Sequence, residues 1–181
     1  MARLPDLDPA AFTPAQAQVH REIAGFHNGH VRGPWALALR IPEVAHHTHA
    51  LYERLARESK LGQRLFELMV LVVARHWTSQ FEWHTHEKYA REGGISDAAI
   101  EAIRNGETPH FDREDEQLVY DVVLELEQKK NLSEALYERA RAYFGEDLLV
   151  ELVAAAGLYT MVAMMLNAFE MPIPETARPL R

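Results

Sequence analysis

The chain of 181 residues contains no cysteine. Without a thiol, it has no means to form a disulfide, bind a metal through thiolate or attack a substrate through sulfur. Any chemistry must therefore come from carboxylates, imidazoles, hydroxyls or a bound cofactor. The first two kinds of group are abundant, because the sequence holds 27 acidic residues and 10 histidines.

Basic residues are outnumbered by acidic ones. The 19 lysines and arginines leave a formal net charge of -8, and they form no stripe that could follow a phosphate backbone. This charge pattern argues against nucleic-acid binding. We expect the partner to be a small molecule or another protein chain.

Long hydrophobic runs are nearly absent. The N-terminus lacks a basic segment followed by an apolar stretch, so it does not resemble a signal peptide. The longest uncharged segment, residues 152–169, is slightly short for a membrane span and contains Gly157, Thr160 and Asn167. We interpret it as a buried or subunit-contacting helix, and we expect a cytoplasmic protein without a membrane anchor.

Helical periodicity and helix-start signals recur along the whole sequence, and no segment alternates apolar and polar residues long enough for a half-buried strand. The chain is therefore predicted to be all-α and to form a single domain, residues 1–181. Residues 1–12 and the proline-rich tail 171–181 are expected to be extended, and residues 27–35 to form a loop. Helices are expected at about 14–26, 42–59, 61–76, 80–92, 97–105, 113–130, 134–143 and from about 147.

The residues that could carry chemistry lie on two neighbouring helices. Ser79, Glu82 and His86 share one helical face, and Glu82 and His86 form an i,i+4 pair whose side chains can meet. A carboxyl group and an imidazole held together are suited to general acid/base catalysis. Glu67 lies on a strongly apolar helix, where an unpaired carboxylate would be costly, so it is expected to face a polar pocket or to have a partner.

Other interpretations of these residues remain open at this point. Glu82 and His86 could form an ordinary exposed pair, with Glu67 on the solvent face of its helix. His46 and His49, spaced i,i+3, could both reach one metal ion, but the sequence does not identify the further ligands that a catalytic site needs, and no metal is expected. The aromatic residues Trp35 and Trp83 could wall a pocket or pack in the core.

Several segments together resemble the carboxymuconolactone decarboxylase family, whose fold is also that of alkylhydroperoxidase D. The resemblance rests on residues 30–37, 42–45, 64–71, 82–86, 94–96 and 166–174. It implies an alkylhydroperoxidase D-like helical bundle. It also implies a ring-like homo-oligomer, commonly a trimer or hexamer, with the site near a subunit interface.

In the peroxidase branch of that family, a Glu is followed by Cys-x-x-Cys and a His. The corresponding positions here are Glu67, Ser79, Glu82 and His86, so both cysteines are missing. Thiol peroxidase activity is therefore disfavoured, because no thiolate is present to attack a peroxide. The decarboxylase branch, which the resemblance implies works by proton transfer, also lacks the cysteine pair.

The first hypothesis is therefore a cofactor-independent acid/base enzyme, of the decarboxylase, lyase or isomerase type, acting on a small carboxylated lactone or related acid. Glu82 would carry the proton, His86 would be its partner and Glu67 would orient them. Substrate-binding roles would fall to Ser79, Trp83, Trp35 and His30. The alternatives are a non-catalytic ligand-binding or oligomeric scaffold protein and, third, a metal-dependent enzyme that uses the histidines.

Overall fold

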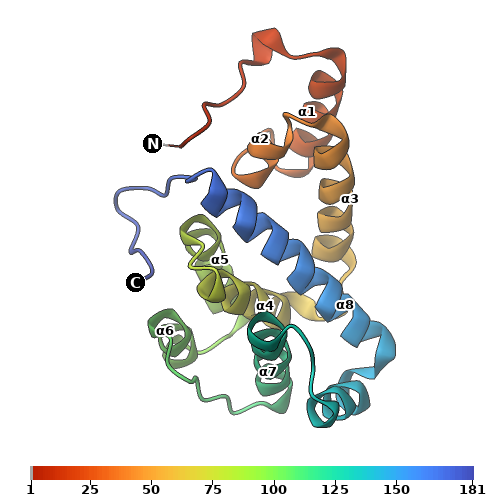
Figure 1. Cartoon of the computed structure of the whole chain (residues 1–181), viewed down its shortest axis with the longest axis vertical. Coiled ribbons are helices and arrows are strands. Elements are labelled where there is room, and N and C mark those ends of the chain that lie inside the picture. The colour runs from red at the N-terminus through yellow and green to blue at the C-terminus, as the bar shows by residue number, and fades with distance from the viewer. Residues whose placement is uncertain (1) are drawn as a thin grey trace.

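The computed structural model describes residues 2–181, and these form helices joined by loops, with no strand (Figure 1). The elements are a 3-10 helix η1 (Pro9–Ala11) and the helices α1 (Pro14–Phe26), α2 (Pro34–Ala38), α3 (Pro42–Glu58), α4 (Gly62–His76), α5 (Gln80–Gly93), α6 (Asp97–Asn105), α7 (Glu114–Lys129) and α8 (Glu134–Ala168). The prediction of an all-α chain is confirmed.

Several helix ends follow directly from the local sequence. Thr13 and Gln16 form a reciprocal capping box at the start of α1, and the Ser96 hydroxyl accepts a hydrogen bond from the Ala99 amide at the start of α6. Gly94 and Gly106 end α5 and α6 in the left-handed conformation that glycine adopts without strain.

Two short elements differ from the sequence prediction. Residues 27–35 were expected to form a loop, but α2 begins at Pro34, directly after Gly33 in a positive-φ conformation. Within the segment 1–12, which was expected to be extended, η1 begins at Pro9 and is capped by the Asp8 side chain. In both cases a proline occupies the first helical turn, where its missing N–H leaves no bond unmade.

The centre of the molecule is α4. Almost every side chain from Leu65 to Ala74 is buried, and Glu67 is the polar exception. Helices α5, α7 and α8 pack around α4, which explains why this helix is apolar on nearly all sides. The tail is fixed to the same bundle, because the backbone of Leu180 exchanges two hydrogen bonds with the Gln80 side chain.

Helix α8 has the length and composition of a membrane-spanning helix. In the structure, 44% of its most apolar window is buried inside the molecule. The buried part of this helix packs in the main core of the bundle. Gly145 interrupts it with non-helical angles, at the break predicted from the sequence, and Leu152, Ala155 and Tyr159 pack into the main hydrophobic cluster.

A second, smaller hydrophobic cluster joins α1, α2 and α3 at one end of the molecule, while α6 and α7 lie at the other end and α8 runs between the two (Figure 1). Ile23, Trp35 and Leu39 are among its buried members. Tyr52 of α3 packs against both clusters and so marks their junction.

Candidate active site

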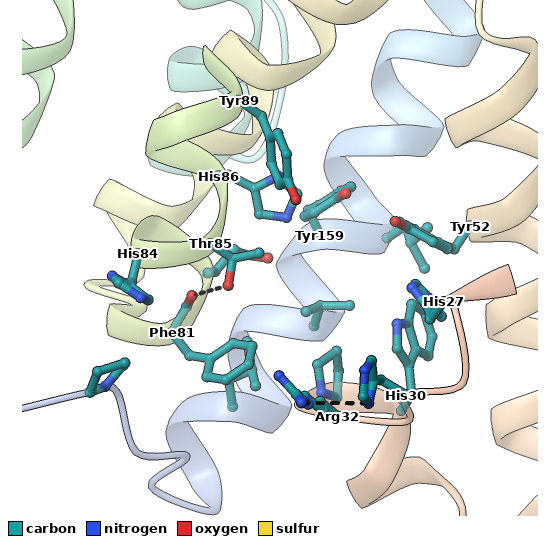
Figure 2. A pocket seen from close by; sticks show the side chains of 17 residues that line it. His27, His30, Arg32, Tyr52, Phe81, His84, Thr85, His86, Tyr89 and Tyr159 are labelled. Carbon is teal, nitrogen blue, oxygen red and sulfur yellow. Dashed lines mark hydrogen bonds between the residues drawn. The ribbon is translucent and has the colours of Figure 1, made fainter. Parts of the chain in front are cut away.

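A cavity of about 520 Å³ opens at this junction, with α5 and α8 on one side and α2, α3 and the preceding loop on the other (Figure 2). Its size is typical of small-molecule sites, which span about 300–1,000 Å³. Apolar side chains such as Trp35, Phe81 and Val162 contribute much of the wall. The few polar groups among them are therefore the groups that a ligand would meet.

Glu82 is the most unusual of these polar groups. It lines the cavity but is only 2% exposed, and within residues 2–181 neither carboxyl oxygen has a hydrogen-bond partner. Burial raises the pKa of Glu82 well above its ordinary value, and the negative charge of Glu127 adds to the rise. The nearby Ser79 hydroxyl lowers the pKa of Glu82 and so offsets part of this rise, although the two side chains form no aligned hydrogen bond. These surroundings favour the protonated form of Glu82, beside a largely apolar cavity.

His86 also lines the cavity, but its partner is not the one expected from helical spacing. Its Nδ1 lies 2.7 Å from Oε2 of Glu67 on α4, whereas no hydrogen bond joins it to Glu82 among the described residues. The reason is that the His86 side chain turns from α5 towards the neighbouring helix. The expectation that Glu67 has a partner is met, and the interpretation of Glu67 as a solvent-facing residue is wrong, because both side chains are largely buried.

Tyr159 of α8 completes this end of the cavity and lies in the segment that was expected to form a buried or subunit-contacting helix. Its ring meets the His86 ring edge-on at a centroid distance of 5.2 Å (Figure 2), and its hydroxyl has no partner within residues 2–181. Burial raises the pKa of Tyr159 well above its ordinary value, and burial likewise raises the pKa of Tyr52 to about 12. Both hydroxyls are therefore available as neutral donors.

Glu127 of α7 is another buried carboxylate that spacing did not single out. Its oxygens accept hydrogen bonds from the Trp77 indole N–H, at 3.1 Å, and from the Thr160 hydroxyl. These donors satisfy its charge, and that charge disfavours ionisation of Glu82.

Arg32 and His30 lie together at the end of the cavity away from His86 and Tyr159 (Figure 2). The Arg32 Nη2 lies 3.5 Å from the His30 Nδ1. His30 and Trp35, two of the predicted binding residues, both line the cavity, and so does Arg32, which was not predicted.

The structure places the other two predicted binding residues elsewhere. Trp83 is 1% exposed and points away from the cavity, where its indole N–H donates to Glu87 and Arg104 stacks over its ring. Ser79 is fully buried behind Glu82 and does not line the cavity. Of the two interpretations of Trp83, the structure therefore supports core packing and not a pocket wall, because that side of α5 packs against α6.

The histidine cluster on α3 does not gather around a common point. His46 pairs with Glu22 at 2.9 Å, His47 lies near Glu43, and His49 is buried with its Nε2 3.1 Å from the Nε2 of His27. Burial lowers the pKa of His49 to about 4 and also lowers that of His27. No group of three or more metal-ligating side chains is found in residues 2–181.

Comparison with solved structures identifies the fold. An uncharacterized peroxidase-related protein from Silicibacter sp. TM1040 superposes with a TM-score of 0.75 and 21% sequence identity, and the match covers 98% of this chain and 94% of that one. A protein of unknown function from Agrobacterium tumefaciens, described as a candidate antioxidant defence protein AhpD, gives a TM-score of 0.64 and 22% identity, covering 76% and 94%. No protein-family model and no curated protein matches the chain.

The chain therefore has the alkylhydroperoxidase D-like helical fold, as the sequence resemblance implied. The side chains at the end of its cavity are a buried carboxyl whose pKa is raised, a carboxylate-bound imidazole and a phenol with no hydrogen-bond partner within residues 2–181. No cysteine is present to perform thiol chemistry. What these groups do offer is proton transfer within an apolar pocket.

Proposed function

We propose that the protein is a cofactor-independent acid/base enzyme of the carboxymuconolactone decarboxylase family. Its substrate class would be a small carboxylated lactone or a related enolisable acid, and its reaction would be of the lyase or isomerase type. The observation that carries the proposal is Glu82, a buried carboxyl with two unpaired oxygens that faces a ligand-sized cavity. An unpaired buried carboxyl is costly to fold, and a bound ligand would supply the missing hydrogen bonds.

Glu82 and His86 would divide the proton transfer between them. A carboxylate only accepts hydrogen bonds, so the His86 Nδ1 that faces Glu67 must carry a proton. In the neutral imidazole this leaves Nε2 as an acceptor, which makes His86 the base. Glu82, whose pKa is raised by burial, would be the acid. One group that gives a proton and one that takes a proton are what an enolisation requires.

The test is a screen of small carboxylated lactones and β-keto acids, read by the mass change of the ligand. Wild-type protein should convert at least one of them, and Glu82→Gln should lose about 10²–10⁴-fold in rate with its fold intact. Glu92→Gln is the matched control, because Glu92 is an exposed residue of the same helix that does not line the cavity. Ligand binding without conversion by wild type would instead support the non-catalytic alternative.

We also propose that the protein is cytoplasmic and forms a homo-oligomer. Helix α8 exposes Val150, Val153 and Met164, at 69%, 38% and 51%, beside the small residues Ala154 and Gly157. An apolar helix face of this kind is typical of a contact between subunits. Val153→Lys should reduce the mass measured by sedimentation equilibrium, and a monomeric wild-type protein would refute the oligomer.

A further inference from the structure

The cavity is electrically asymmetric, and its positive end is Arg32. Within residues 2–181, Arg32 is the single arginine or lysine that lines the cavity, and no carboxylate pairs with it. Its guanidinium can only donate, so the His30 Nδ1 near it must be the acceptor. The Nε2 of His30 then carries the ring proton, and this end of the cavity offers donors from two side chains.

The backbone next to Arg32 packs against the Phe81 side chain of α5. Gly33 has a φ of 58°, and a Cβ atom there would lie 2.6 Å from the Phe81 ring, so the loop backbone packs directly against this side chain of α5. Pro34 then begins α2. A guanidinium on a fixed loop loses less freedom when it binds an anion than one on a mobile loop.

The opposite end of the cavity disfavours a negative charge. An imidazolium at His86 could balance a negative charge at that end, but the His86 ring already faces the Glu67 carboxylate. The Glu82 carboxyl oxygens and the Tyr159 hydroxyl are buried there and have no hydrogen-bond partner within residues 2–181, and the raised pKa of Glu82 favours its protonated form. Such groups donate well to a neutral carbonyl oxygen, but a second carboxylate would have to give up its hydration without meeting a free positive charge.

We propose that Arg32, together with His30, binds the single carboxylate of a monoanionic ligand whose neutral carbonyl end reaches Glu82 and Tyr159. The carboxylate is then held away from Glu82, so it acts as an anchor and is not the reacting group. The assignment of the carbonyl end rests on the proposed function. The anchoring by Arg32 does not, because binding is measured without turnover.

Three ligands of similar shape separate the contribution of the carboxylate at Arg32 from that of the neutral carbonyl at Glu82. They are 4-acetylbenzoate, which is a monoanion with a ketone, its neutral amide 4-acetylbenzamide, and the dianion terephthalate. Their dissociation constants are measured by isothermal titration calorimetry at neutral pH. The proteins are wild type, Arg32→Gln, Glu82→Gln and Arg21→Gln. Arg21 is an exposed arginine of α1 outside the cavity, so its variant removes the same net charge without touching the site.

The wild type and Arg21→Gln should bind 4-acetylbenzoate about tenfold or more tightly than either the amide or terephthalate, because a charge-assisted pair is gained without a second buried charge. Arg32→Gln should lose that advantage. Equal binding by wild type and Arg32→Gln, equal binding of terephthalate, or no binding of 4-acetylbenzoate to wild type would each overturn the proposal. If Glu82→Gln binds normally and no lactone or β-keto acid is converted, the proposed reaction fails while the anchor stands.

Discussion

The His86 imidazole and the Glu67 carboxylate, which come from different helices, meet at 2.7 Å beside the cavity. This contact fixes which nitrogen of His86 carries a proton and which nitrogen is left to act on a ligand. It also explains how an acidic residue is accommodated on the most buried helix of the fold.

Replacing Glu67 should therefore lower stability, and the loss should be larger when the substitute has no hydrogen-bond acceptor. Glu67→Leu would leave a largely buried imidazole nitrogen without its acceptor and should lower the free energy of unfolding by about 1–3 kcal/mol. Glu67→Gln keeps an acceptor oxygen and should cost less. Urea denaturation followed by circular dichroism measures both variants. Identical midpoints for Glu67→Leu and wild type would mean that the contact contributes nothing.

Stability should decrease as pH rises, because of Glu82. Its folded pKa is raised above the ordinary value of 4.5, so between these two values the folded state binds more protons than the unfolded state. Stability from this group is therefore complete below 4.5 and is lost as pH rises through the folded pKa. Glu82→Gln, which is always neutral, should show a flatter profile of melting temperature against pH. Parallel profiles would contradict the buried neutral acid.

The histidine pair on the other side of the cavity should have the opposite effect. The pKa of His49 falls from 6.5 to about 4 in the folded state, because burial disfavours the charged ring. The unfolded state then binds more protons than the folded state in that interval, so stability is lost as pH falls from 6.5 towards 4. His49→Phe should reduce this acid loss, as measured by thermal melts at stepwise lower pH. Unchanged acid sensitivity would show that other groups dominate it.

The loop that carries Arg32 should not tolerate a larger residue at Gly33. Gly33→Ala combines an unfavourable positive φ with a contact at 2.6 Å to the Phe81 ring, and it should lower the free energy of unfolding by about 1–3 kcal/mol. Phe81→Ala in the same chain should recover the steric part alone. Gly25→Ala is the control, since nothing lies within 4 Å of its position. It should be neutral or stabilising by up to about 1 kcal/mol, because alanine favours helix.

Much of the fold could be predicted from the sequence because helix ends are encoded locally. The caps at Thr13 and Ser96 and the glycines at 94 and 106 act within one helical turn, so their meaning does not depend on the rest of the chain. Helix α2 was missed because five residues are too few to show a period, and Gly33-Pro34 is equally typical of a loop.

The site was harder to predict because its contacts join helices that are far apart in the sequence. Glu67 could be recognised as the one acid in an apolar helix, but its pairing with His86 depends on how α4 and α5 cross. Tyr159 has the same spacing as its buried neighbours, and only its unpaired hydroxyl distinguishes it. Trp83 is one residue from Glu82, and that step of about 100° around α5 turns its side chain away from the cavity, where its indole N–H donates to Glu87.

The position of the cavity between two hydrophobic clusters has a consequence for local opening. The α1–α3 cluster has few buried members, so its backbone amides should exchange with solvent through partial opening more readily than those of α4. A ligand that touches Arg32 and Trp35 on one side and Tyr159 on the other would bridge the clusters and bind only the closed form. Hydrogen exchange in α1 and α3 should then slow in proportion to ligand occupancy, so these helices would report binding even where no reaction occurs.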